Sequence, residues 1–188
     1  AVQPGDEDDY FQSSLFTIAR RRILWLLILV LANGLTTKVI AMNDQILKEI
    51  VLLAAFIPLL IGTGGNVGAQ SSTVVIRGLS TQKLKSLGAV KAVFKEAITG
   101  ALLGILMMLV VFPFAWWQGE GPLIASAVGI SLISITTLAA TTGAILPLLF
   151  DRMKLDPALM SSPFITTVTD IAGVFIYLST ANWLLSST

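Results

Sequence analysis

Residues 163–185 read PFITTVTDIAGVFIYLSTANWLL, an apolar run interrupted by a single charged residue, Asp170. A run of this length can cross a bilayer as one helix, for which about 20 residues suffice. A carboxylate inside such a helix costs ~2.5–3.5 kcal/mol on insertion scales. No other acidic or basic residue is expected at a comparable depth to pair with Asp170. A passing cation or a proton is therefore its natural partner.

The composition is that of a membrane protein. Hydrophobic residues make up 55% of the chain and charged residues only 12%, whereas a soluble domain carries roughly 25% charged residues. The chain has neither Cys nor His, which excludes disulfides, Cys/His zinc sites and His proton relays. Any bound metal must then be held by oxygen, which favours hard cations such as Mg²⁺, Ca²⁺ or Mn²⁺.

Five apolar segments predict an all-α membrane protein with five transmembrane helices. They cover residues 23–41, 46–76, 92–117, 122–150 and 163–185. The second segment would be roughly 45 Å long as one helix. Because this exceeds the ~30 Å hydrocarbon core, that helix must tilt, protrude or break. An odd number of spans argues against an inverted repeat, and five helices are few to enclose a pore, so a pathway between two subunits is favoured.

The distribution of Lys and Arg predicts the orientation. Basic residues gather before the first segment, between the second and third, and between the fourth and fifth: Arg20, Arg21, Arg22, Arg77, Lys83, Lys85, Lys91, Lys95, Arg152 and Lys154. The other two connections contribute only Lys48. The N-terminus is therefore expected in the cytoplasm and the C-terminus outside, in a multi-pass protein of the cell inner (plasma) membrane. The predicted outer ends carry the tryptophans that favour an interface: Trp116, Trp117 and Trp183.

The fifth segment carries a polar stripe. Ser162, Thr166 and Asp170 follow at a spacing of four residues, which stacks them on one helix face. Gly173 continues near the same face and Thr167 flanks it. The stripe predicts a lining for an ion pathway, with Asp170 as the metal-binding carboxylate. The alternative is an interhelical hydrogen-bond stripe in which Asp170 is protonated.

The second segment contains PLLIGTGGNVGAQ at residues 58–70. Gly64 and Gly68 form a G-x-x-x-G pair, which is typical of close helix packing. Pro58 and the glycines also suit a distorted helix whose freed carbonyls line a cavity. Asn66, Gln70 and Thr73 form a second, uncharged polar stripe with the helical spacing. These three side chains are candidates for pore lining.

Acidic residues cluster near the N-terminus, from Asp6 to Asp9. Such a run is usually a solvated tail. The functional alternative is a cytoplasmic divalent-cation site that senses or gates, for which Asp8 and Asp9 are the candidates.

The two membrane motifs together resemble the MgtE family of magnesium channels. Residues 58–79, PLLIGTGGNVGAQSSTVVIRGL, resemble that family's second transmembrane helix. Residues 156–178, DPALMSSPFITTVTDIAGVFIYL, resemble its fifth helix and the loop before it. The resemblance covers the whole membrane portion, and both motifs occur in the family's order.

The resemblance implies a homodimer with one pore at the subunit interface, lined by the second and fifth helices. Asp170 falls on the family's essential pore aspartate, Thr166 comes next along the path, and Ser162 lies near the cytoplasmic mouth. Residues 23–188 would be the pore domain, and residues 1–22 would be an acidic segment and the end of a linking, plug-like helix. The family's cytoplasmic sensor and CBS domains are expected to be absent from this chain, as missing partners.

The function expected from these observations is import of Mg²⁺ through a dimeric channel, with Mn²⁺ or Co²⁺ as further candidate ions. Mg²⁺ gives up its waters reluctantly. Two copies of Asp170 would supply two negative charges, which match the charge of the divalent ion. The alternative is a proton- or sodium-coupled secondary transporter that uses Asp170 as its carrier carboxylate. An intramembrane aspartyl protease needs two membrane carboxylates, so no enzymatic activity is expected. The expected partners are membrane lipid and divalent cations, with no nucleic acid.

Overall fold

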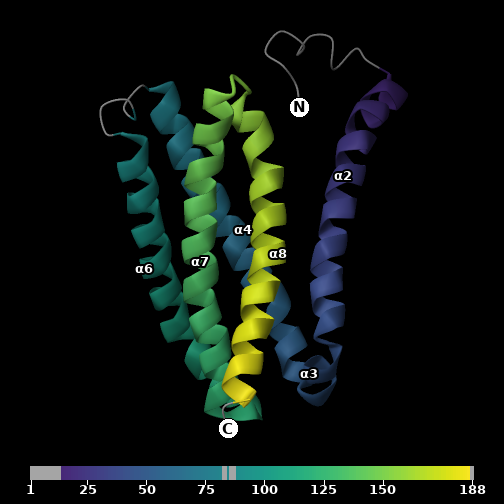
Figure 1. Ribbon diagram of the computed structural model, residues 1–188, viewed down its shortest axis with the longest axis vertical. Coiled ribbons are helices and arrows are strands. Elements are labelled where there is room, and N and C mark those ends of the chain that lie inside the picture. The colour runs from purple at the N-terminus through teal and green to yellow at the C-terminus, as the bar shows by residue number, and fades with distance from the viewer. Residues whose placement is uncertain (1–13, 82–83, 85–87, 187–188) are drawn as a thin grey trace.

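The computed structural model describes residues 14–81, 84 and 88–186, and these residues are almost entirely helical (Figure 1). In chain order the elements are α2 (Leu15–Met42), α3 (Asp44–Glu49), α4 (Val51–Ser80), α6 (Ala89–Ala115), the π-helical turn η1 (Trp116–Glu120), α7 (Gly121–Arg152) and α8 (Pro157–Ser186). The predicted all-α class is confirmed.

Within the described residues, four stretches of helix are long and apolar enough to cross a membrane. They are Val51–Ser80, Ala89–Gln118, Gly121–Arg152 and Pro163–Ser186. They correspond to the second to fifth predicted segments. The first predicted segment lies in α2, which contributes a shorter apolar stretch, Leu26–Met42.

Helix α7 is the centre of the bundle. It packs against α6, α4 and α8, and 61% of its most apolar stretch is buried, against 17% for α6. The core is formed by fully buried side chains of α4, α7 and α8, among them Leu53, Leu132, Ile135 and Tyr177. Helix α2 packs on α8 and stands to one side of the bundle (Figure 1). Helix α6 is therefore covered by the chain mainly on one side, while α7 is enclosed.

The second apolar segment was predicted to tilt, protrude or break. In the structure its helix breaks at Ile50. This residue separates α3 from α4 with φ −129° and ψ 84°. Helix α4 then continues unbroken through Pro58 for 30 residues. Helix α4 is thus not interrupted at Pro58 or at the glycines. Pro58 lies near the start of α4 and is exposed, and a proline in a long membrane helix is tolerated where its lost hydrogen bond can be compensated.

The last helix starts earlier than predicted. The apolar run begins at Pro163, but α8 begins at Pro157. Proline suits the first helical position because it lacks the N–H that would have no partner there. Asp170 consequently lies roughly 20 Å from the start of α8, near the middle of this helix.

Glycines bring α4 into close contact with α7 and α8, as the G-x-x-x-G pair predicted. A Cβ atom added to Gly64 would lie 2.8 Å from Ile135 Cγ2, and one added to Gly68 would lie 2.5 Å from Ile165 Cγ2. On the facing helix, a Cβ at Gly143 would collide with the carbonyl oxygen of Gly68 and lie 3.1 Å from Ser71 Cβ. The backbones of α4 and α7 can approach this closely only because neither residue has a side chain.

We expect Gly143→Ala to destabilise the protein by about 1–3 kcal/mol, the usual cost of overpacking. The atom in the way is a backbone carbonyl of α4, so the clash can be relieved only by moving the helices apart. The measurement is the melting temperature of the purified protein in detergent, followed by size-exclusion chromatography after heating. Gly34→Ala is the matched control, because nothing lies within 4 Å of its Cβ position. Equal melting temperatures for the two variants would contradict the packing described for Gly143.

Candidate ion-conducting site

Asp170 is partly buried on α8, beside the fully buried Thr169. Within the described part of the chain, no side chain forms an ion pair or a hydrogen bond with its carboxylate. These residues contain no group of three or more acidic side chains that could hold a metal ion together. One protomer therefore offers a single intramembrane carboxylate and not a complete metal cage.

The two threonines next to Asp170 direct their hydroxyls to their own helix. Thr166 Oγ1 donates a hydrogen bond to the carbonyl oxygen of Pro163 at 3.0 Å. Thr169 Oγ1 donates to the carbonyl oxygens of Ile165 and Thr166 at 2.8 and 2.9 Å. The lone pairs of these hydroxyl oxygens are still able to accept hydrogen bonds. One turn before Asp170, the Thr166 hydroxyl is therefore an oxygen that can accept a hydrogen bond from a hydrated ion.

Helices α4 and α8 run antiparallel, and their contacts fix the depth of Asp170 relative to α4. Thr166 of α8 lies beside Gly65 of α4: a Cβ atom added to Gly65 would be 3.9 Å from Thr166 Cγ2. Thr169 likewise lies beside Gly64, where an added Cβ would be 3.8 Å from Thr169 Cβ. Further along, the hydroxyl of Tyr177 donates to the carbonyl oxygen of Leu53 at 3.1 Å. Asp170 therefore lies level with residues 61–63 of α4.

The exposed face of α4 is polar or small over most of its length. From Pro58 to Arg77 the exposed residues are Pro58, Gly62, Asn66, Gln70, Thr73, Val74 and Arg77. The outer face of α6 has a different character, because its middle exposes Ile98, Leu102, Ile105, Leu106, Leu109 and Val110. The α6 face suits lipid tails. The amides of α4 suit water or another protein surface, since polar side chains are costly against hydrocarbon.

Gly62 leaves an open space on this polar face. It is exposed, and nothing lies within 4 Å of its Cβ position. It lies one turn before Asn66 and, from the helix register, at the depth of Asp170. Sequence reasoning did not single out Gly62 as a site residue. The signal that could have found it is its spacing of four from Asn66 and eight from Gln70.

The described predicted site residues lie on two helices that pack against each other, α4 and α8. Asn66, Gln70 and Thr73 share the exposed face of α4, and Thr73 Oγ1 donates to the carbonyl oxygen of Ala69 at 2.9 Å. Thr166, Thr167 and Asp170 are partly buried on α8.

Gly173 is placed differently from the other predicted residues. It is buried against α7, where its Cβ position lies 3.6 Å from Ile135 Cδ1, so it packs inside the protomer and does not lie on the open stripe. The side chain of Ser162, and Asp8 and Asp9, lie outside the described residues.

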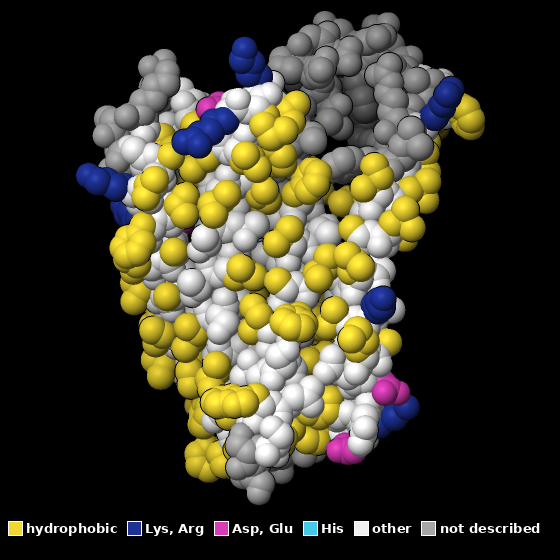
Figure 2. Space-filling model, viewed as in Figure 1, with side chains coloured by type: hydrophobic (Ala, Val, Ile, Leu, Met, Phe, Trp, Pro, Cys, Tyr) yellow, Lys and Arg dark blue, Asp and Glu magenta, His cyan; other side chains and the backbone are white. Residues whose placement is uncertain are grey.

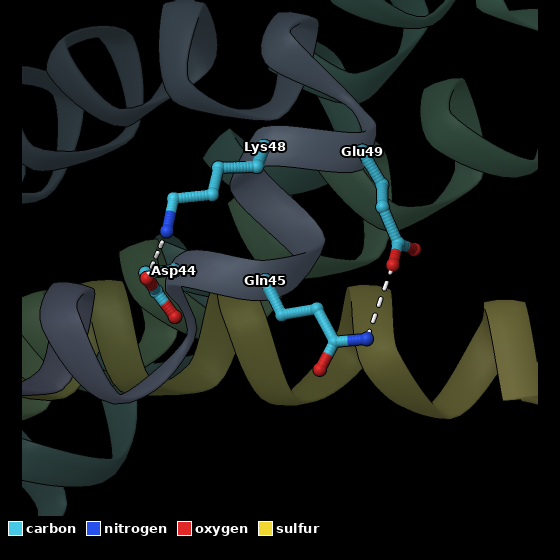
Figure 3. Close-up of polar contacts among 4 residues, drawn as sticks. All are labelled: Asp44, Gln45, Lys48 and Glu49. Carbon is cyan, nitrogen blue, oxygen red and sulfur yellow. Dashed lines mark hydrogen bonds and ion pairs between the residues drawn. The ribbon is translucent and has the colours of Figure 1, made fainter.

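The far end of the bundle carries its own polar contacts (Figure 3). On α3 the ammonium of Lys48 donates to the carboxylate of Asp44 and, mainly through this hydrogen bond, lowers the pKa of Asp44. Gln45 donates to Glu49 at 3.1 Å, one turn along the same helix. Both carboxylates are exposed and engaged by neighbours, so they differ from Asp170 in depth and in surroundings.

Charged side chains concentrate at the two ends of the molecule. Figure 2 shows hydrophobic side chains along the helices, with most of the visible Lys and Arg near one end. That end includes Arg77 in the last turn of α4 and Arg152 in the last turn of α7. The first turns of α6 add Lys91 and Lys95. This asymmetry agrees with the distribution of basic residues in the sequence.

The chain is similar to known transport proteins over most of its length. Residues 57–180 match the MgtE family, which is described as a divalent cation transporter. A protein of Thermus thermophilus named magnesium transporter MgtE is 39% identical over 88% of this chain and 37% of its own length. Proteins of the same name from Bacillus subtilis and Enterococcus faecalis are 33% and 34% identical over 96% and 87% of this chain. The chain spans 40% or less of each of these relatives.

Proposed function

Because the chain belongs to the MgtE family of divalent cation transporters, we propose that it conducts Mg²⁺ across the inner (plasma) membrane as a homodimer. It is a multi-pass membrane protein of a transporter family, not an enzyme. In the proposed assembly the pore lies between two copies and is lined by α4 and α8. Five helices of each copy cross the membrane, with the N-terminus in the cytoplasm, the C-terminus outside and Ser162 near the inner mouth.

The observation that carries this proposal is the polar face of α4 beside Asp170. A protomer that exposed Asn66 and Gln70 to lipid would leave their amides without hydrogen-bond partners. A second copy on a two-fold axis would instead place the same face opposite itself and enclose a polar space. Asp170 lies level with residues 61–63 of α4, which supports a position for its carboxylate at the edge of this space.

The mechanism follows from the chemistry of the ion. Mg²⁺ prefers octahedral oxygen and retains its waters. Two copies of Asp170 would supply two negative charges for one divalent cation, and the Asn66, Gln70 and Thr166 oxygens would accept hydrogen bonds from its water shell. Selection by charge and hydrated size then requires no stripping of the ion. Mn²⁺ and Co²⁺ have the same charge, and we propose them as weaker competing ions.

A current recording tests the channel mode directly. The purified protein is reconstituted in planar bilayers with a Mg²⁺ gradient and with equal pH and Na⁺ on both sides. A channel gives currents that reverse at the Mg²⁺ equilibrium potential and do not change when a pH or Na⁺ gradient is added. The competing hypothesis is a proton- or sodium-coupled transporter. It predicts that the reversal potential follows the proton or sodium gradient, and that result would overturn the channel.

A further inference from the structure

Helix α6 carries a groove near the end at which the basic residues gather. The groove has a volume of about 580 Å³ and is lined by Val90, Lys91, Phe94, Lys95, Ile98 and Thr99. These residues repeat with a spacing of four along one side of the helix, and we call them the α6 groove. The ion pathway proposed above uses α4 and α8, so it leaves the groove unused.

One row of the groove, formed by Lys91, Lys95 and Thr99, is positively charged. Lys91 and Lys95 lie one turn apart, both are exposed, and neither forms an ion pair within the described residues. Among the described residues, the lining contains no acidic side chain. Glu96 is partly buried and lies outside the lining. Two ammonium groups in one groove therefore have no counter-charge from the described lining residues.

The adjacent row, formed by Val90, Phe94 and Ile98, is apolar and exposed. Phe94 is 67% exposed and Ile98 is 47% exposed, and Thr99 satisfies its hydroxyl by donating to the carbonyl oxygen of Lys95. Lys91 and Ile98 are roughly 10 Å apart along the axis. The lysines lie in the first turns of a candidate span that extends from Ala89 to Gln118. The groove thus presents two ammonium groups beside an apolar row that continues to Ile98. The long lysine side chains can extend toward the headgroups while the apolar row faces the acyl chains.

We propose that the α6 groove binds one anionic glycerophospholipid, with its phosphate between Lys91 and Lys95 and an acyl chain along Phe94 and Ile98. Lysine clusters at the cytoplasmic ends of membrane helices attract anionic lipid, and the apolar floor matches the lipid tail. A second copy of this chain fits less well. A two-fold axis through the groove would bring the lysines of both copies together, and their like charges would repel. The proposal requires insertion in a membrane but does not depend on which ion is carried.

Native mass spectrometry of the full chain in a neutral detergent tests this site. The protein is titrated with phosphatidylglycerol, with phosphatidylcholine and with inorganic phosphate. We expect one phosphatidylglycerol per chain to be retained at low lipid concentration. Since each lysine near a membrane surface contributes about a factor of five, the double variant Lys91→Gln/Lys95→Gln should bind this lipid about 30-fold more weakly. Phe94→Ala should weaken it with no change in charge.

The matched control is Arg152→Gln/Lys154→Gln, which removes the same charge from exposed positions at the same end of the bundle. It should bind phosphatidylglycerol like the wild type. Equal losses in the two double variants would show general attraction and overturn the site. Equal retention of phosphatidylcholine, or full competition by inorganic phosphate, would also overturn it. A change of oligomeric state in Lys91→Gln/Lys95→Gln would identify the groove as an interface between copies instead. Ion flux is not measured, so the outcome is separate from the transport proposal.

Discussion

Asp170→Asn is expected to lower Mg²⁺ uptake at least about 100-fold while the protein still folds and inserts. The substitution keeps the size of the side chain and removes its charge. At an effective dielectric constant of about 20, two unit charges 4 Å apart interact by roughly 4 kcal/mol. The substitution removes two carboxylates from the site of one divalent ion, one from each copy. The interaction energy lost then exceeds the roughly 2.7 kcal/mol that corresponds to a 100-fold change. The folded protein should not suffer, because Asp170 makes no ion pair among the described residues.

The assay is Mg²⁺ entry into liposomes that contain purified protein and a fluorescent indicator for Mg²⁺. Asp151→Asn is the matched control, since it removes the same charge from an exposed position at the end of α7. The control should transport like the wild type. Normal uptake by Asp170→Asn would refute an essential role for this carboxylate and favour the interhelical hydrogen-bond stripe.

Mixing the two proteins tests whether two copies share one pore. Wild-type and Asp170→Asn chains with different tags are co-expressed at known ratios and reconstituted together. If one ion faces a carboxylate from each copy, and one is insufficient, uptake should fall as the square of the wild-type fraction. A linear fall would mean that each chain conducts on its own, and it would overturn the pore between copies while leaving the role of Asp170 intact.

Hydropathy alone was sufficient to predict where the long helices lie, but not where they begin or break. The break at Ile50 falls inside QILKEIVLLAAF, residues 45–56, in which no Gly or Pro signals a boundary. The early start of α8 was missed because an apolar run marks only the part of a helix that lies in the hydrocarbon core. The backbone hydrogen bonds of α8 continue beyond that part to Pro157.

The candidate site was predictable to the extent that one helix determines it. A spacing of three to four residues placed Asn66, Gln70 and Thr73 on one face, and the structure shows all three exposed together. The same spacing did not indicate that Gly173 is buried against α7. A step of three residues from Asp170 turns the helix back by about 60°, and in the bundle that direction faces Ile135 of α7. Which neighbour covers which face depends on tertiary packing, and the spacing within a helix does not contain that information.

The openness of Gly62 leads to the second large effect. Gly62→Leu is expected to lower Mg²⁺ uptake roughly 100-fold, because it places an apolar group in the polar space at the depth of Asp170. A hydrated cation needs both room and water, and a hydrophobic constriction removes both. The helix itself should tolerate the change. Nothing lies within 4 Å of the Cβ position, and Leu is a better helix former than Gly by about 1 kcal/mol.

Gly34→Leu separates this effect from the addition of a large side chain as such. Gly34 lies on α2, is exposed, and is equally free of neighbours within 4 Å. Both variants should melt at or above the temperature of the wild type, whereas only Gly62→Leu should stop Mg²⁺ entry into liposomes. Gly62→Ala should give an intermediate rate, because a methyl group narrows the space without filling it. If Gly62→Leu transports as well as Gly34→Leu, the exposed face of α4 does not line the pathway. The amides of Asn66 and Gln70 would then need a different partner, and the contact between copies would have to be placed elsewhere on the bundle.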